Sequence, residues 1–399
     1  MDRRNARIGR RGALIAAGVA VALTALAEPT QAAMITRTPS TGPEQAGARA
    51  DLAERAVVER YVHTLWEWPR MQLGALTWPA SIVDHFLPAR WCYWWQAHLL
   101  DCAVDAAARA RTPERIDRIA ALAHGIRARN ITGWTNSYYD DMSWLILALE
   151  RADRLLDVRF GAALGDLRTA LIDGWNPAVG AVPWKSGNDY YSTSAVGPAG
   201  IAMARLGELP RAGQLAEFLN TRLREPGSGL IFDGLHEPGG TVDRVLLTYC
   251  QGVAIGLEVE LARRTGESAH RRRAAELVAA TAARMTENGV ITAGGGNDSG
   301  LFMGILARYL AEAALSLGDT TAAHIVHASA RAAWEHRAEV DGLPLFGADW
   351  TRAVTVPEYS GTFPPPADDS SAGLSRDLSV QLSGWMVLEA DHRLTTAGY

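Results

Sequence analysis

From Ala50 onward, the apolar residues of this chain recur with a helical period, and the alternation typical of strands is nearly absent. The pattern predicts an all-α protein. The twelve predicted helices span residues 50–67, 90–111, 113–129, 139–157, 159–173, 190–206, 208–224, 245–265, 267–287, 299–317, 319–338 and 376–395.

The even-numbered helices differ from the odd-numbered ones. Each even-numbered helix opens with polar and aromatic residues, as in Trp91–His98, and then becomes mostly apolar. The odd-numbered helices carry Arg, Glu and Ala in a surface pattern, as in Arg109–Arg129. This alternation predicts six hairpins closed into a ring, with the even-numbered helices inside and their N-termini at one end. The long loops that precede four inner helices should rim that end; they are residues 68–89, 174–189, 225–244 and 339–375.

Two adjacent carboxylates, Asp140 and Asp141, open the fourth predicted helix. Their like charges repel, so the second proton should leave at a raised pKa. One ionised and one protonated carboxyl group close together is what glycoside hydrolysis needs. The alternative is a structural role, because aspartate is favoured in the first turn of any helix. A metal site of the DDxxD type is disfavoured, since Met142–Trp144 contains no third acid.

The composition excludes several other classes. A net charge of −5 gives no indication of the basic surface that nucleic-acid binding requires. Thirteen Trp and ten Tyr outnumber seven Phe, which suits a carbohydrate surface, although such residues also fill cores. The three cysteines form no disulfide framework, and no Cys/His spacing indicates zinc. We therefore expect no metal and no cofactor.

Residues 1–33 are typical of an export signal, with five arginines before the apolar stretch Ala13–Ala27 and small residues at Ala32 and Ala33. Arg10-Arg11 indicates the twin-arginine route, and an uncleaved anchor is the alternative. Residues 34–48 read as a flexible linker, so 49–399 should form the folded domain. We expect the mature protein outside the cytoplasmic membrane.

The motifs of this chain resemble those of glycoside hydrolase family 76, the α-1,6-mannanase family, from about Arg55 to Glu389. The matching pieces are Trp94–His98, Tyr138–Asp141, Tyr249-x-Gln251-Gly252, Asp298-x-x-x-Phe302-x-Gly304-Ile305 with Arg308–Leu310, and Leu378–Gln381.

The resemblance implies an (α/α)6 barrel of twelve helices and retaining hydrolysis of α-1,6-mannosidic bonds in an α-mannan. It assigns Asp140 as nucleophile and Asp141 as acid/base. Retention requires carboxyl groups about 5–5.5 Å apart. Adjacent residues deep in a regular helix face different directions, so the pair must stand at a helix start or a distorted turn.

Aromatic and polar residues near the same helix starts are the candidate sugar contacts. They are Trp94, Trp95, Tyr138, Tyr139, Asp189, Tyr249, Gln251, Asp298 and Phe302. Each has a structural alternative: Asp298 as a helix cap, one of the two tryptophans as a core residue, and Gln251 or Tyr249 as core packing. His98 is more often a core histidine than a catalyst.

Three functions compete. The first is an exported, monomeric α-mannan hydrolase, or a transglycosylase on cell-envelope mannan that uses the same acids. The second is a non-catalytic glycan-binding wall protein, which the intact Asp pair disfavours. A sugar epimerase would need several histidines on inner helices, where we find only His98.

Overall fold

The computed structural model describes residues 42–68, 70–80, 91–292, 297–356 and 375–399, without the side chains of Asn297 and Asp298. These residues belong to one compact unit, Ser40–Tyr399. The predicted export signal lies outside the described residues.

Twelve α-helices form within the described ranges. Six of them make an inner ring: α3 (Tyr93–Arg109), α5 (Tyr139–Leu156), α7 (Thr193–Arg205), α9 (Thr248–Thr265), α11 (Phe302–Leu317) and α14 (Leu378–Thr396). The other six lie outside: α1 (Pro43–Tyr61), α4 (Pro113–Arg129), α6 (Gly161–Asp173), α8 (Leu209–Phe218), α10 (Ser268–Arg284) and α12 (Thr320–Glu335).

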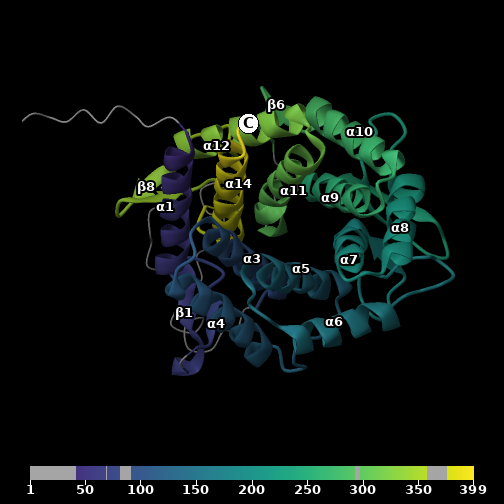
Figure 1. Cartoon of the computed structure of the whole chain (residues 1–399), viewed down its shortest axis with the longest axis horizontal. Coiled ribbons are helices and arrows are strands. Elements are labelled where there is room, and N and C mark those ends of the chain that lie inside the picture. The colour runs from purple at the N-terminus through teal and green to yellow at the C-terminus, as the bar shows by residue number, and fades with distance from the viewer. Residues whose placement is uncertain (1–41, 69, 81–90, 293–296, 357–374) are drawn as a thin grey trace, which may run out of the picture. The chain divides into compact units, whose positions relative to one another are not determined.

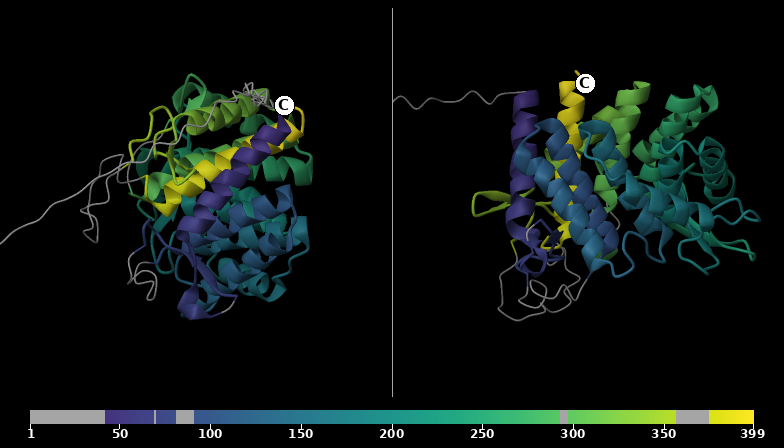
Figure 2. Two further views of the ribbon diagram at one scale, coloured as in Figure 1. Left: turned by 90° about the vertical axis from the view of Figure 1, so that its left-hand side faces the viewer. Right: turned by 60° about the horizontal axis from the view of Figure 1, so that its bottom comes forward.

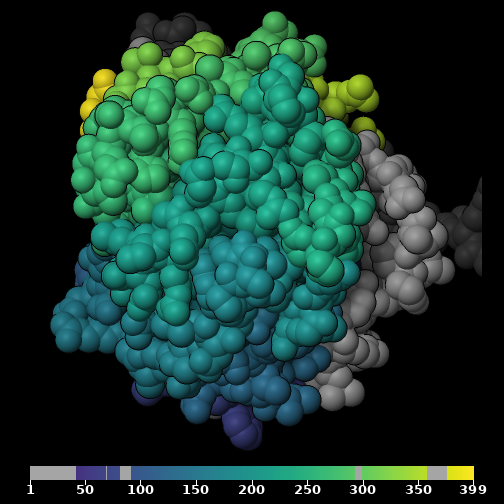
Figure 3. Space-filling view, turned by 90° about the vertical axis from the view of Figure 1, so that its right-hand side faces the viewer, coloured from purple at the N-terminus to yellow at the C-terminus, as the bar shows by residue number. Residues whose placement is uncertain are grey.

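Each inner helix packs against the next in chain order, and α14 packs against α3 to close the ring (Figure 1). Each outer helix packs on an inner partner. The first helix, α1, lies along the last, α14, as both views of Figure 2 show. Segments from the middle of the chain form a continuous outer face on the side of α8 and α10 (Figure 3). This is the expected (α/α)6 barrel.

Burial explains which helices lie inside. Every residue of α9 from Thr248 to Ala262 is buried, whereas α10 buries a single stripe at helical spacing. Two glycines allow close packing within the inner ring: a Cβ on Gly252 would lie 2.9 Å from Leu306 Cα, and one on Gly304 would lie 2.7 Å from Ser383 Cα. The helical stretch Ser299–Leu317 is long and apolar enough to cross a membrane, but it is mostly buried here as an inner helix.

Short strands occupy the connections, and they explain several misplaced helix boundaries. The described strands are β1 (Val62–Thr64), β2 (Gln72–Gly74), β3 (Tyr190–Ser192), β4 (Phe232–His236), β5 (Thr241–Leu246), β6 (Thr286–Glu287), β7 (Val290–Ile291), β8 (Ala338–Val340) and β9 (Leu343–Leu345). β3, β4 and β5 form one antiparallel sheet, and the other strands form two-stranded hairpins. Strand residues were wrongly included in three predicted helices, 50–67, 190–206 and 245–265. Strands this short show no detectable alternation of polar and apolar residues.

The linker also ends earlier than predicted. α1 begins at Pro43, so residues 43–48 are helical. Proline suits the first turn, where its missing N–H is not needed, and Glu44 complements the helix dipole there. The predicted helix 208–224 is also divided, since α8 ends at Phe218 and a π-turn, η2 (Leu219–Leu223), follows it.

Three inner helices each hold a rim loop in place through the same kind of hydrogen-bond pair. The fourth residue of α3, α9 and α14 is a buried glutamine, whose side-chain amide binds both the N–H and the C=O of one loop residue. Gln96 binds Gly74, Gln251 binds Ile231, and Gln381 binds Phe346, at 2.8–3.1 Å. Such paired hydrogen bonds satisfy buried backbone groups and hold the rim loops in register with the ring.

Further along α3, Asp101 and Asp105 lie one helical turn apart on a buried face, and we call them the deep pair. Arg308 from α11 forms an ion pair with each of them, at 2.9 Å from Asp101 and 2.7 Å from Asp105. Arg151 from α5 also forms an ion pair with each of them. Two arginines therefore neutralise two buried carboxylates and tie three inner helices together.

Candidate active site

A cavity of about 620 Å³ opens at the end of the barrel where the inner helices begin. Its walls come from the starts of α3, α5, α7, α9 and α11 and from the loops before them. The lining residues are Trp91, Cys92, Tyr93, Trp94, Asn130, Asn136, Ser137, Tyr138, Asp140, Asp141, Trp144, Trp184, Ser194, Asp233, Leu247, Tyr249, Phe302 and Ile305. The alternating sequence pattern predicted this convergence of helix N-termini.

Asp140 and Asp141, which we call the cavity pair, are the second and third residues of α5 and line this cavity. Tyr138 precedes the helix with an extended backbone and provides no side-chain cap. Asn136 stabilises the turn that leads into α5, because its Oδ1 accepts a hydrogen bond from Tyr138 N at 2.8 Å. The pair therefore stands at a helix start, as the sequence predicted.

Three donors converge on Asp140. The Trp184 indole N–H lies 2.8 Å from Oδ2, the Ser194 hydroxyl lies 3.3 Å from the same oxygen, and the Asp141 backbone N–H lies 2.9 Å from Oδ1. Burial raises the pKa of Asp140 to about 6, although these hydrogen bonds oppose the rise. The donors stabilise the ionised form, so Asp140 is the more acidic member of the pair.

Asp141 has fewer compensating partners. Asn136 Nδ2 donates to its Oδ2 at 2.7 Å, and the Trp94 backbone N–H at the start of α3 also stabilises the charged form. Burial, and then the charge of Asp140, raise the pKa of Asp141 to about 8. At neutral pH the cavity pair therefore holds one proton, on Asp141.

Backbone pairing places Trp184 over the cavity pair. Tyr139 N donates to Trp184 O at 3.0 Å, Trp184 N donates to Tyr190 O at 2.7 Å, and Tyr138 forms an antiparallel bridge with Lys185. The loop before α7 is thus fastened to the start of α5. In the sequence, Trp184 was only a member of the predicted rim loop 174–189, and no role was indicated for Asn136.

Aromatic rings surround the acids. Phe302 lies between Tyr249 and Trp94, with ring centroids 4.6 Å and 6.4 Å away. The Tyr138 ring packs edge-on against the Trp184 ring, with 5.1 Å between the two ring centroids. Flat apolar faces beside hydrogen-bonding groups suit a sugar ring, which is apolar on its faces and polar at its rim.

Asp233, from β4, is a third carboxylate in the cavity wall, and the sequence did not single it out. Tyr190 donates to its Oδ2 at 2.7 Å, and the Tyr249 hydroxyl donates to its Oδ1. Its only signal in the sequence was membership of the predicted rim loop 225–244.

Four predicted sugar contacts lie away from the cavity. Trp95 is buried in the core, because it sits one position past Trp94 and faces the other way. The ring of Tyr139 packs onto the Cα of Gly174. Asp189 is exposed and pairs with His236, and Gln251 serves as a loop clamp. The predicted contact through the Asp298 side chain lies outside the described part of the structure.

His98, on α3, is buried and does not line the cavity. Burial lowers the pKa of His98 to about 3, so its imidazole is neutral and stacks near Trp144 at 4.5 Å between ring centroids. Within the described ranges, no three His, Cys, Asp or Glu side chains come together to hold a metal ion.

Comparison with known proteins assigns the family. The model of glycosyl hydrolase family 76 matches residues 48–365. A search of curated protein sequences found no match. The GH76A α-1,6-mannanase of Salegentibacter sp. HEL1_6 is 24% identical, with a TM-score of 0.74 over 87% of this chain and 98% of that one.

The Lin0763 protein of Listeria innocua is likewise 24% identical, with a TM-score of 0.74 over 89% of this chain and 99% of that one. These likenesses show the same fold. Because the family model covers most of the chain, including both members of the cavity pair, this protein belongs to glycosyl hydrolase family 76.

Proposed function

We propose that the protein hydrolyses α-1,6-mannosidic bonds of an α-mannan with retention of configuration. The observation that carries this proposal is the unequal environment of the cavity pair: three donors reach Asp140, while Asp141 keeps its proton at neutral pH. A nucleophile must be ionised and a general acid must be protonated at the same pH.

In the first step, an oxygen of Asp140 attacks the anomeric carbon, and Asp141 gives its proton to the glycosidic oxygen as the bond to the leaving mannan chain breaks. In the second step, the Asp141 carboxylate takes a proton from water, whose oxygen attacks the anomeric carbon and releases Asp140. Two inversions at one carbon leave the α configuration unchanged.

The substrate class is supported by a solved relative. An inactive variant of the Salegentibacter mannanase, in which two neighbouring aspartates were replaced, is described in complex with α-1,6-mannotetraose; it is 25% identical to this chain over 87% of it. We propose that Trp94, Tyr249 and Phe302 stack on the sugar rings here, and that Asp233 accepts hydrogen bonds from their hydroxyl groups.

Incubation of the protein with linear α-1,6-mannan tests the proposal. We expect shorter oligosaccharides, with the α anomer as the first product seen by NMR before mutarotation. Products longer than the substrate would indicate transglycosylation. An initial β anomer would contradict the nucleophile assignment, and unaltered mannan would favour a glycan-binding role.

A substrate with an activated leaving group separates the two roles. Asp141→Asn should retain the first step on such a substrate, because its leaving group needs no proton. Asp140→Asn should not, because no covalent intermediate can form. Equal losses in both variants would contradict the separate roles.

We further propose that the mature protein acts as a monomer outside the cytoplasmic membrane. The arginines and the apolar stretch of residues 1–33 support export. Cell fractionation with an antibody to the barrel tests the location, and light scattering tests the oligomeric state. A purely cytoplasmic species that retains residues 1–33 would contradict export.

A further inference from the structure

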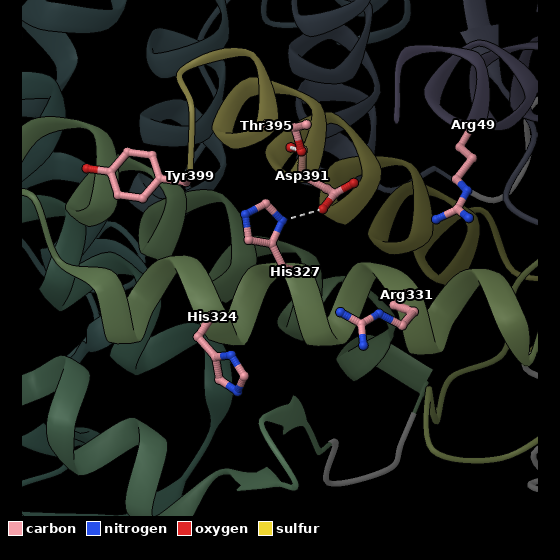
Figure 4. A pocket seen from close by; sticks show the side chains of 7 residues that line it. All are labelled: Arg49, His324, His327, Arg331, Asp391, Thr395 and Tyr399. Atoms are coloured by element: carbon pink, nitrogen blue, oxygen red, sulfur yellow. Dashed lines mark hydrogen bonds and ion pairs between the residues drawn. The ribbon is translucent and has the colours of Figure 1, made fainter. Parts of the chain in front are cut away.

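A second cavity, of about 380 Å³, lies where α1, α12 and the last turns of α14 meet (Figure 4). It shares no lining residue with the catalytic cavity. Asp391 in its wall comes thirteen residues after Leu378, the first residue of α14. That separation is about 20 Å along the helix, so the second cavity lies toward the opposite end of the barrel.

Positive charge dominates this cavity. Arg49 reaches it from α1 and Arg331 from α12, and neither forms an ion pair with another described residue. Arg49 lies over the Trp334 ring, 5.3 Å from its centroid, and Arg337 lies over the same ring at 3.8 Å. Burial lowers the pKa of Arg337, and the nearby charge of Arg49 lowers it further, although Glu339 opposes both effects. The guanidinium groups therefore repel one another.

Among the described residues, the carboxylate in the wall, Asp391, pairs with His327 and with neither arginine of the cavity. His327 Nδ1 lies 2.6 Å from Asp391 Oδ1, along the dashed line of Figure 4. The other ring nitrogen, Nε2, is buried and has no hydrogen-bond partner among the described residues.

We propose that this second cavity binds a phosphate-class oxyanion. Guanidinium groups present planar pairs of donors that match the oxygens of phosphate, and two of them reach the cavity from different helices. His327 and His324 lie in the same wall (Figure 4). The anion can be a phosphoryl group on a glycan or on a lipid headgroup. The site does not depend on the catalytic activity proposed above.

Isothermal titration of the full chain with sodium phosphate, against sodium chloride at matched ionic strength, tests the site. We expect phosphate binding that weakens by at least about 100-fold in the Arg49→Gln/Arg331→Gln variant, because each charge-assisted contact is worth about ten-fold or more. Arg55→Gln is the matched control: it lies on α1, but its guanidinium is exposed and pairs with Glu59. It should bind phosphate as the unaltered protein does.

Three outcomes would overturn the proposal: no heat beyond that of chloride, equal losses in the control and double variants, or competition between phosphate and mannotriose. The double variant should keep its melting temperature and its mannan hydrolysis. If it fails to fold, Arg331→Gln alone gives the test, because that side chain is exposed.

Two further probes identify the source of the anion. Mannose 6-phosphate represents a phosphorylated glycan. Phosphatidylglycerol vesicles, with phosphatidylcholine vesicles as control, represent a lipid headgroup. The probe whose binding is lost in the double variant identifies the source, and arginine-independent binding of both would contradict the proposal.

Discussion

The deep pair and the cavity pair are both buried carboxylate pairs on inner helices of one barrel, and they differ in what faces them. Two arginines meet the deep pair, whereas the cavity pair forms no ion pair with any described residue. Burial pushes the pKa of Asp101 upward, but Arg151 and Arg308 outweigh it and the pKa falls. In the cavity pair the effect of burial prevails, and both pKa values rise.

The comparison shows that burial alone does not make an acid reactive. A buried carboxylate that faces a guanidinium stays ionised and cross-links the fold. One that faces only neutral donors keeps a proton available for transfer. Position on the helix contributes, because the cavity pair sits among free N–H groups at a helix start, while the deep pair lies one turn apart on a face that meets α5 and α11.

The largest expected effect is on activity. Asp140→Asn should lower hydrolysis of linear α-1,6-mannan by at least about 10⁴-fold, and Asp141→Asn by about 10²–10⁴-fold, with the fold retained. In contrast, Asp105→Asn should keep the activity of each folded molecule and lower only the amount that folds. Rates normalised to folded protein by circular dichroism check this. If Asp105→Asn lowered the rate per folded molecule as much as the cavity-pair variants do, the two pairs would not differ in function.

The ring and its inner helices were predictable, because the alternation of apolar and polar helices records burial directly. The cavity pair was predictable because its two carboxylates are adjacent in the sequence. Strand positions such as β3 and β1 were not, since three residues cannot display a period.

The partners of the acids were harder to predict. Trp184 reaches Asp140 across 44 positions in the chain, and Tyr190 reaches Asp233 across 43. Such contacts depend on which loops pair across the barrel mouth, and no local spacing encodes that pairing. The prediction that Gln251 contacts the sugar was wrong for a related reason, since a buried side-chain amide can bind the backbone of a loop as well as a sugar.

The next largest effect concerns stability. Arg151→Met should leave the deep pair with one cation and lower the free energy of unfolding by about 3–5 kcal/mol. Arg159→Met is the control, because its side chain is 77% exposed and its ion pair with Asp157 is worth little. Urea unfolding followed by circular dichroism measures both variants. A loss below about 1 kcal/mol for Arg151→Met would show that the deep pair does not stabilise the fold.

The pH dependence of activity is a smaller effect. The pKa values near 6 and 8 predict a bell-shaped kcat/KM with its maximum near pH 7. The rate should fall about ten-fold per pH unit on each side, as Asp140 gains a proton or Asp141 loses one. Measurement from pH 4 to 10 tests this. On a substrate with an activated leaving group, the alkaline fall should disappear, and a maximum below pH 5 would contradict the raised pKa values.

The last effect is a gain in stability from removing the proposed general acid. The folded-state pKa of Asp141 is raised to about 8, above its unfolded value of about 4. Between those values the native state holds a proton that the unfolded state lacks, so stability falls as pH rises from 4 to 8. Asp141→Asn removes this loss and should stabilise the protein at pH 8 by at least about 1 kcal/mol.

The gain should be smaller at pH 5, where Asp141 is protonated, and Asp101→Asn should destabilise at both pH values because it leaves arginine charge unpaired. Thermal unfolding at pH 5 and pH 8 gives the comparison. If Asp141→Asn destabilises the protein at pH 8 as Asp101→Asn does, the cavity pair is a structural element like the deep pair, and its place at the helix start is that of a cap.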